Sequence, residues 1–307
     1  SHPVLHKGGK FTVGNFTGGT SPVSRAGQFL SNMLFLRGDV TPSPHLVALT
    51  VPEKFLWSDG NGARAVSSEQ SKLALISGFG LAFPWAPTPE GITPGRKPDL
   101  AVLPTGAADV ETHGWYTSVI ETKDRNFSLA DVVKEMKKRG ILPKENLTDP
   151  DRGIFQTDTG EITMRQQEKL VKVVTPRTEA VTMLAGRSEP LGALEVKNST
   201  ADACIGATSI DGKPLAESDR IVLVYSTEMV NSGMILSGSR ASLIKFGIAP
   251  ALMRTGTLEL SLRNAGSGMV LYALAVDGTR VERLPLDPAV DGRLSIRIDT
   301  SKLAKGP

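Results

Sequence analysis

Residues 157–181 read TDTGEITMRQQEKLVKVVTPRTEAV, and this stretch decides how the rest of the chain is interpreted. Two apolar runs joined by a polar turn predict one strand at 160–163 and a second at 170–174. The second strand is expected to stop at Thr175-Pro176-Arg177, because proline lacks a ladder donor and keeps the preceding residue extended. Helix and loop patterns dominate before this stretch, and strand patterns dominate after it. Residues 157–181 therefore mark the entrance to a second domain.

The sequence from residue 153 onward has the pattern of an antiparallel β-sandwich. Short apolar runs recur at intervals of about 8–12 residues, as the strands of a sandwich do. Asp-Gly pairs between several of these runs are strong hairpin signals. The runs predict strands at 161–164, 170–174, 180–185, 191–196, 203–209, 220–226, 249–251, 256–262, 269–276 and 294–298.

The first 150 residues predict a mixture of helices, short strands and loops. Apolar spacing of three and four predicts helices at 23–36 and 129–139, each followed by a glycine. We interpret Arg37-Gly38-Asp39, an RGD tripeptide, as a helix stop with an ordinary ion pair. Residues 41–115 are rich in Pro and Gly and predict an ordered but irregular stretch with strand-like segments at 46–51, 73–79 and 100–103. The predicted fold class is mixed: an N-terminal α+β region, residues 1–150, followed by an all-β antiparallel sandwich, residues 151–307.

Composition excludes several classes of protein. In 307 residues, 35 Lys and Arg nearly balance 32 Asp and Glu, and a net charge of +3 without a basic run argues against nucleic-acid binding. Cys204 is the single cysteine, so no disulfide forms within the chain, and its apolar neighbours predict a core position. No apolar run reaches the ~20 residues that a membrane-spanning helix needs.

One grouping combines acids, an imidazole and an aromatic ring within a dozen residues: Glu111, His113, Trp115 and Glu121. Such side chains can line a polar pocket for a sugar, because aromatic rings stack on sugar rings while polar groups bind hydroxyls. The alternative, that the aromatic residues of this region fill a modest core, stays open. The chain has no metal-ligand spacing such as HExxH, and we expect neither a metal nor a cofactor.

Seven segments carry a family resemblance: TDTGEI at 157–162, VTPRT at 174–178, SIDGKPL at 209–215, SDRIVLV at 218–224, MVNSGM at 229–234, PALM at 250–253 and YALAVDGTRV at 272–281. They resemble the C-terminal β-domain of large bacterial glycoside hydrolases with a TIM-barrel catalytic domain, of the retaining clan that includes families 5, 39 and 42. Ser232 stands where the family pattern has threonine. SPV at 21–23 and LFLRGDV at 34–40 are similar to the end of the barrel and the segment leaving it. The resemblance covers 150–300 well and 10–45 loosely.

The resemblance implies that residues 1–150 are the end of a (β/α)8 barrel and an irregular linker region, and that residues 151–307 pack on a catalytic barrel lying mostly upstream. Such enzymes act on an oligo- or polysaccharide through two carboxylates ~5–5.5 Å apart. We find no such pair, so the catalytic carboxylates are expected outside this chain. The implied location is secreted, periplasmic or on the cell surface of a bacterium.

Two other functions remain as alternatives. A non-catalytic carbohydrate-binding or cell-surface module would need a row of exposed aromatic rings, whereas residues 153–307 contain only Phe155, Tyr225, Phe246 and Tyr272. A complete enzyme would need an acid pair, such as Glu111 with Glu121, in one cleft.

Overall fold

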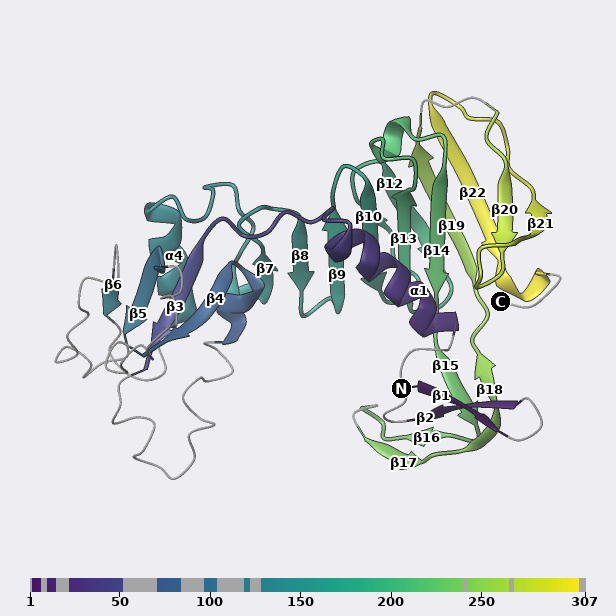
Figure 1. Ribbon diagram of the computed structural model, residues 1–307, viewed down its shortest axis with the longest axis horizontal. Helices are drawn as coiled ribbons and strands as arrows, with labels where there is room; N and C mark the ends of the chain where they lie inside the picture. Colours follow the sequence, from purple (N-terminus) through teal and green to yellow (C-terminus); the bar gives the residue numbers. More distant parts are fainter. Residues whose placement is uncertain are drawn as a thin grey trace, which may run out of the picture. The chain divides into compact units, whose positions relative to one another are not determined.

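The structure of the chain is a computed structural model (Figure 1). It describes residues 2–6, 10–14, 22–51, 71–83, 97–103, 119–121, 128–239, 242–264 and 268–303. The mixed fold class is confirmed: a short N-terminal parallel sheet with helices precedes antiparallel sheets that form the bulk of the protein.

The chain forms two compact units, and each is described here by itself. The sandwich unit comprises residues 1–40 and 168–307, and the parallel-sheet unit comprises residues 41–167. The first 40 residues thus fold with the sandwich. The division expected at residues 150 and 151 stays a prediction about domains, because compactness alone does not test it.

The parallel-sheet unit is built on a four-stranded sheet in the order β4-β3-β5-β6, with every neighbouring pair parallel. Its strands are β3 (Leu46–Thr50), β4 (Gly78–Ala82), β5 (Leu100–Leu103) and β6 (Val119–Glu121). Helix α4 (Leu129–Lys138) buries its apolar side against β3 and β5 in one core. That core consists of Val47, Leu49, Leu73, Ile76, Leu100, Val102, Leu129, Val132, Val133, Met136, Ile141, Leu142 and Phe155.

The strands expected at 46–51 and 100–103 are confirmed as β3 and β5, and in the described parts of residues 41–115 they belong to a regular sheet rather than to an irregular stretch. The strand expected at 73–79 is wrong: Lys72–Leu75 form the 3-10 helix η3, and the strand starts at Gly78. A short apolar run such as LALI fits a helical turn as well as a strand. The sequence of β4, GFGLA, gives only a weak strand signal, because two of its five residues are glycine and glycine is depleted in strands.

The remainder of the parallel-sheet unit is a hairpin of β7 (Ile154–Gln156) and β8 (Ile162–Arg165), preceded by the 3-10 turn η4 (Pro150–Arg152). Gly160, in the turn between the strands, has a φ of 77°, a left-handed conformation that favours glycine. The polar TDTGE segment is therefore the tip of a hairpin.

The sandwich unit has two antiparallel sheets, ordered β14-β13-β10-β9 and β11-β12-β19-β22. The first contains β9 (Leu170–Val174), β10 (Thr178–Met183), β13 (Ala203–Ser209) and β14 (Ile221–Ser226). The second contains β11 (Glu189–Pro190), β12 (Leu194–Ser199), β19 (Thr257–Arg263) and β22 (Arg293–Asp299). The predicted strand stop is confirmed, because β9 ends at Val174.

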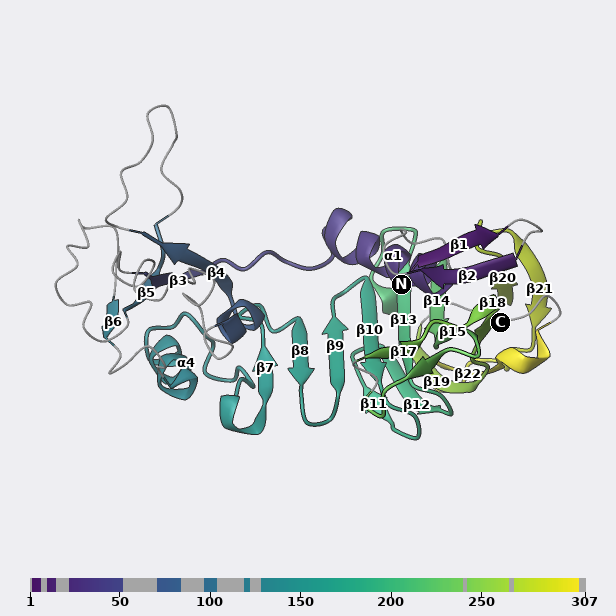
Figure 2. The same ribbon diagram turned by 90° about the horizontal axis from the view of Figure 1, so that it is seen from below.

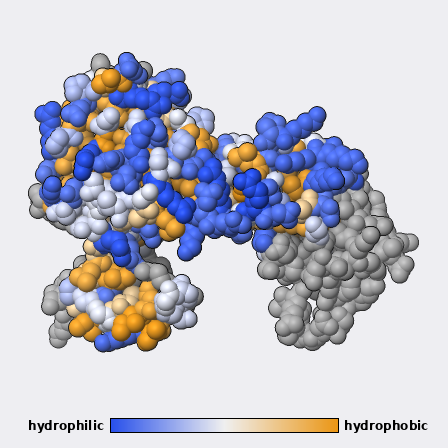
Figure 3. Space-filling view, turned by 180° about the vertical axis from the view of Figure 1, so that it is seen from behind, coloured by the Kyte–Doolittle hydropathy of each residue, from blue (hydrophilic) through white to orange (hydrophobic). Residues whose placement is uncertain are grey.

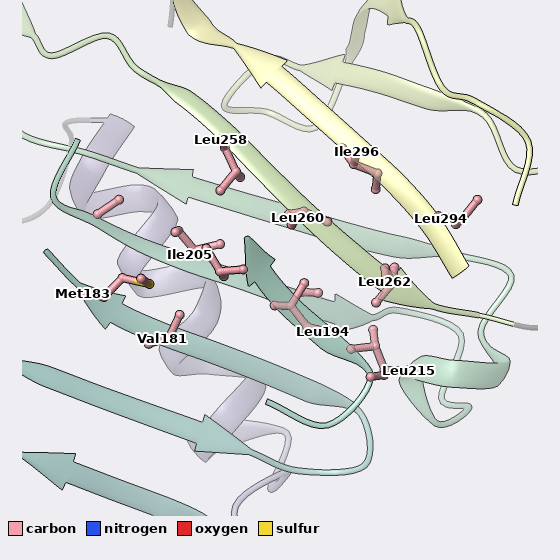
Figure 4. Close-up of a cluster of buried hydrophobic side chains, with 14 of the residues drawn as sticks. Val181, Met183, Leu194, Ile205, Leu215, Leu258, Leu260, Leu262, Leu294 and Ile296 are labelled. Carbon is pink, nitrogen blue, oxygen red and sulfur yellow. The ribbon is translucent and has the colours of Figure 1, made fainter. Parts of the chain in front are cut away.

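The two sheets face each other across one apolar core (Figure 4). Alternate residues of each strand point into it, as a sandwich requires. Side chains of both sheets labelled in Figure 4 are Val181, Met183, Leu194, Ile205, Leu258, Leu260, Leu262, Leu294 and Ile296. Leu215, in the 3-10 turn η5 (Leu215–Glu217), closes one end of this core.

Helix α1 (Pro22–Ser31) packs on the first sheet of the sandwich unit. Leu30 contacts Ala180 and Val224 there, and Gly206 makes room for it, since a Cβ at Gly206 would lie 3.0 Å from Leu30 Cδ2. The π-helical turn η1 (Asn32–Leu36) continues the helix, and Gly38, with a φ of 75°, follows it. The helix predicted at 23–36 is confirmed in position, although its last turn is π-helical.

Small two-stranded sheets complete the sandwich unit (Figure 2). They pair β1 (His2–His6) with β2 (Lys10–Gly14), β15 (Met229–Ser232) with β18 (Ile248–Met253), β16 (Ile235–Leu236) with β17 (Leu243–Lys245), and β20 (Leu271–Leu274) with β21 (Arg280–Leu284). The 3-10 turn η6 (Thr300–Lys302) follows β22. The described helices include none with the length and apolar character needed to cross a membrane.

Candidate functional site

The sugar pocket predicted from the sequence lies largely outside the described residues. This holds for Glu111, His113 and Trp115, whereas Glu121 is the last residue of β6, where its backbone pairs with Leu103 of β5. The grouping of these four side chains, and the Glu111–Glu121 acid pair, stay predictions.

The backbone nevertheless places Glu121 at the carboxyl edge of the parallel sheet, where ligands bind in folds of this kind. In open parallel sheets, ligands bind beyond the carboxyl ends of the strands, where the strand order reverses. Of the four strands of this sheet, β3 comes first in the sequence. It has β4 on one side and β5 on the other, so the strand order reverses at β3. Glu121 ends β6 at the same carboxyl edge, next to β5.

The opposite, amino edge of this sheet holds a polar cluster built on Asp158. Ser43 Oγ donates to Asp158 Oδ2 at 2.5 Å, and His45 Nδ1 lies 3.3 Å from the same oxygen. Ser43 Oγ also accepts the Gly78 N–H at 2.9 Å, at the start of β4. The cluster therefore joins the chain before β3 and the start of β4 to the tip of the β7–β8 hairpin.

Serine, histidine and aspartate suggest hydrolase chemistry, but their geometry does not match a catalytic triad. A triad needs the imidazole between the hydroxyl and the carboxylate, within hydrogen-bond reach of the hydroxyl. Here Ser43 and His45 both approach one oxygen of Asp158, and no hydrogen bond joins Ser43 Oγ to the His45 ring. Asp158 is fixed by its own backbone, whose N–H donates to the Ile76 carbonyl at 2.7 Å.

Asp158 has one unusual atom. Its side chain is 1% exposed, yet Oδ1 has no hydrogen-bond partner in the structure. A buried carboxylate oxygen without a donor loses hydration and gains nothing in return. The cluster thus links three segments of the parallel-sheet unit through hydrogen bonds and leaves Asp158 Oδ1 unsatisfied.

The sandwich unit holds a second buried aspartate, Asp39, which is fully partnered. Arg177 Nη2 lies 2.6 Å from Oδ1, and Arg37 Nε donates to Oδ1 at 2.9 Å. Arg37 Nη2 and Thr178 Oγ1 both bind Oδ2, the latter at 2.7 Å. We call Asp39, Arg37, Arg177 and Thr178 the Asp39 clamp. The expected ion pair within the RGD tripeptide is confirmed, and Asp39 faces inward, with its side chain 0% exposed.

Electrostatics in the clamp favour the ionised carboxylate. Burial alone would raise the pKa of Asp39, but hydrogen bonds from Arg37 and Thr178 and the charges of Arg37 and Arg177 hold that pKa below its ordinary value. Arg37 Nη1 also donates to the Ser209 carbonyl at 2.5 Å. The clamp therefore ties the end of η1 to β10 and β13.

The backbone of the Thr175-Pro176-Arg177 turn forms hydrogen bonds with several segments of the sandwich unit. Thr175 N–H donates to the Thr178 carbonyl at 2.9 Å, and the Pro176 carbonyl accepts the Leu215 N–H at 2.7 Å. The Arg177 carbonyl accepts the Ser209 N–H at 2.8 Å. The turn thus ends β9 and also fixes the chain at Ser209 and Leu215.

Glu179, two residues after Arg177, is a buried carboxylate satisfied by backbone alone. It accepts the N–H groups of Gly192, Ala193 and Leu194 at 2.9, 2.7 and 2.8 Å. Gly192 permits this approach, because a Cβ there would lie 2.5 Å from Glu179 Oε1. Glu179 fixes the chain where it enters β12.

The SIDGKPLAESD segment forms a loop held by Asp211 and Asn264. Asp211 accepts from Ser218 Oγ and from the Asp219 N–H, both at 2.8 Å. Burial works to raise the pKa of Asp211, but these hydrogen bonds lower it below its ordinary value. Asn264 Nδ2 donates to the carbonyls of Leu215 and Ser218 at 3.1 and 2.9 Å.

Cys204, for which a core position was predicted, is half-buried. It packs with the cluster that joins α1 to the first sheet, and burial raises the pKa of its thiol. A raised pKa disfavours the reactive thiolate. Within the part of the chain that the structure describes, no three His, Cys, Asp or Glu side chains are grouped to hold a metal ion.

Comparison of the chain with models of protein families, with curated proteins and with solved structures finds no match in any of the three.

Proposed function

We propose that this chain is the C-terminal part of a carbohydrate-degrading glycoside hydrolase, in which the β-sandwich is a structural partner of a catalytic barrel lying mostly upstream. One observation carries the proposal. Two of the stretches that resemble this family, 34–40 and 174–178, are joined by the ion pair of Asp39 with Arg177, residues that are 138 positions apart in the sequence.

The other resembling stretches also have structural tasks. Asp211 and Ser218 hydrogen-bond to each other within their loop, and Asn231 Nδ2 donates to the Phe246 carbonyl at 3.1 Å. Residues that bind substrate need polar atoms free to reach it. The polar atoms of these side chains form hydrogen bonds within the chain, which supports a structural role.

Buried carboxylates of the sandwich unit are poor candidates for the catalytic pair. Asp39 binds two arginines, Glu179 binds three backbone N–H groups, and Glu189 binds Lys172 Nζ at 2.7 Å. A retaining glycosidase needs two carboxyl groups that reach one sugar from opposite sides. The described residues of the sandwich unit therefore favour chemistry located elsewhere.

The alternative, a carbohydrate-binding module, receives less support. Phe155 is buried in the core of the parallel-sheet unit, and the Tyr225 hydroxyl lies 3.1 Å from Ser199 Oγ. Tyr272 has the guanidinium of Arg280 over its ring at 4.7 Å. Phe246 remains as the one exposed ring of the four, and one ring does not make a row for sugar stacking.

The direct test measures release of reducing sugar from a panel of plant and algal polysaccharides by the purified chain. We expect no release, and no retardation of the chain in gels that contain the same polysaccharides. Release that is abolished by Glu111→Gln or Glu121→Gln would overturn the proposal in favour of a complete enzyme. Retardation without release would favour the binding module.

A second test reads the coding sequence that precedes residue 1. The proposal predicts alternating strand and helix patterns with an Asn-Glu pair at the end of a strand. A preceding sequence without this alternation would contradict it.

A further inference from the structure

Strands β15 to β18 carry apolar side chains on the outside of the sandwich unit. We define the apolar face as the exposed large residues Ile235, Leu243, Ile244, Phe246, Ile248 and Leu252. Figure 3 shows apolar residues gathered over the small sheets of this unit. Soluble monomers seldom expose a contiguous apolar patch of more than a few hundred Å², and larger patches mark interaction sites.

The sequence of β18, IAPALM, is that of a strand covered on both sides. Ile248, Pro250 and Leu252 point outward, while Ala249, Ala251 and Met253 are half-buried. A strand with one face in water normally alternates apolar and polar residues, whereas a continuous apolar run is typical of a strand buried on both faces. Ile248 is nevertheless 71% exposed. Strand β2 lies against β18 and β15, yet Ile248, Pro250 and Leu252 remain exposed, so these three residues are open to a covering partner.

Strand β17 adds an open edge to this face. One edge pairs with β16, where Leu236 lies opposite Leu243 and Ile235 opposite Lys245. No strand among the described residues pairs with the other edge, and all three residues of β17 are exposed. Leu243 and Ile244 of this strand are apolar and Lys245 is charged, and an exposed edge strand offers unpaired N–H and C=O groups to another chain.

We propose that the apolar face binds a second copy of this chain around a two-fold axis, with β17 pairing antiparallel to β17 of the other copy. A two-fold axis perpendicular to the strand necessarily pairs it antiparallel with its own copy. With the axis at Ile244, each Lys245 lies opposite Leu243 of the other copy. Two lysines then do not face each other.

The exposed area matches what such a dimer needs. With about 200 Å² for each fully exposed side chain of this size, the six residues leave roughly 600 Å² in water. A homodimer interface of standard size covers about 800 Å² per partner, of which roughly 500 Å² is apolar. The surface is also poor in charge, since residues 229–253 carry only Arg240 and Lys245. A surface with so little charge lacks a basis for selecting a partner of opposite charge, and its two positive charges repel those of a second copy only weakly.

Sedimentation equilibrium over a range of concentrations tests the proposal. The chain is expected to form a dimer that dissociates on dilution. Ile244→Glu and Ile248→Glu should each weaken the dimer at least tenfold, because they place like charges in an apolar interface. Val276→Glu and Val290→Glu are matched controls, as both side chains are exposed in the same unit outside the apolar face. They should leave the dimer unchanged.

Three outcomes would overturn the proposal. These are a chain that stays monomeric at all concentrations, a dimer that survives both Ile244→Glu and Ile248→Glu, and a dimer that Val276→Glu weakens equally. A monomer would mean that something other than this chain covers the face. Circular dichroism of each variant verifies that the loss of association is not a loss of folding.

A cross-link tests the register of the paired strands. In a Cys204→Ala background, Ile244→Cys places two thiols opposite each other at the two-fold axis, where the Cα separation of an antiparallel pair suits a disulfide. Mild oxidation should yield a covalent dimer on a non-reducing gel. Val276→Cys in the same background should yield no covalent dimer, and equal cross-linking of both variants would contradict the proposed axis.

Discussion

Two aspartates, one in each compact unit, are buried to the same degree but are partnered very differently. In the sandwich unit, Asp39 has both carboxylate oxygens bound, by two arginines and a threonine. In the parallel-sheet unit, Asp158 has one oxygen near Ser43 and His45, while the other has no partner. Both residues join an N-terminal segment to a strand or hairpin. Burial alone therefore does not reveal how much a carboxylate contributes to stability.

The difference follows from the charge of the partners. A buried carboxylate next to guanidinium groups recovers through charge and hydrogen bonds what it loses in hydration. The hydroxyl of Ser43 and the imidazole of His45 do this less well, and the unsatisfied Oδ1 adds a cost. The Asp39 clamp should thus stabilise its unit, whereas Asp158 chiefly specifies how its turn is placed.

Removing the charge of Asp39 should have the largest effect. Asp39→Asn leaves Arg37 and Arg177 without their counter-charge in a partly buried site, so the free energy of unfolding should fall by about 3 kcal/mol. Urea denaturation measures this value. Asp287→Asn is the control, since Asp287 is exposed, and it should change stability by less than about 0.5 kcal/mol. Equal losses of unfolding free energy in the two variants would contradict the claim that the Asp39 clamp stabilises the sandwich unit.

Glu179 sharpens the comparison, because its partners are backbone groups rather than arginines. Glu179→Gln replaces one acceptor oxygen with an amide N–H that faces donors, so one or two hydrogen bonds are lost and the free energy of unfolding should fall by about 2 kcal/mol. The same denaturation experiment measures it. Glu161→Gln, at a carboxylate whose contact with the Thr41 hydroxyl is exposed, is the matched control. An unchanged midpoint for Glu179→Gln would show that backbone donors alone do not stabilise a buried carboxylate here.

Acid should weaken the clamp by a smaller amount than the substitution. The folded-state pKa of Asp39 lies below its unfolded value, so the stabilisation is complete above about pH 4 and is lost as the pH falls through the folded-state pKa. Thermal melting between pH 5 and pH 2.5 tests this. The wild-type chain should lose more stability than Asp39→Asn in that range. Since other carboxylates titrate in both proteins, the difference between the curves isolates Asp39, and parallel curves would contradict the assignment.

The smallest effect is expected at Asp158. Asp158→Asn removes a buried charge with an unsatisfied oxygen and keeps an acceptor for Ser43, so stability should change by less than about 1 kcal/mol. Ser43→Ala is a useful companion, because it removes the hydroxyl that donates to Asp158 and accepts from Gly78. If Asp158→Asn costs as much as Asp39→Asn, the distinction between the two aspartates fails.

The longer strands of the sandwich unit were predicted well because each is long enough to show its own pattern, whereas the short strands β11, β16 and β17 were not predicted. The strands predicted at 170–174 and 203–209 coincide with β9 and β13, and Asp-Gly turns separate several others. Strands β3 and β5 of the parallel sheet were predicted at 46–51 and 100–103, but the sheet itself was missed because its strands lie far apart in the sequence. Pairing of β3 with β4 and β5 depends on contacts between distant residues, which no local pattern reveals.

The polar sites were predictable only in part. The RGD tripeptide and the Thr-Pro-Arg stop were each recognised, and their local roles are confirmed. The contact between these two motifs in the Asp39 clamp was not predicted, since an ion pair between Asp39 and Arg177 depends on the packing of α1 and η1 on the sheet. Asp158 lies in a stretch that was read as a turn, and its burial had no signal in the sequence. Glu111, His113, Trp115 and Glu121 remain a prediction.

The measurement that tests the central claim most directly is a double-mutant cycle between Asp39 and Arg177, whose ion pair helps to hold the segment 34–40 on the sandwich. Unfolding free energies are compared for the wild type, Asp39→Asn, Arg177→Gln and the double variant. Direct contact predicts a coupling energy of about 2 kcal/mol. A coupling energy near zero would contradict the clamp and, with it, the interlocking of the two family-like stretches.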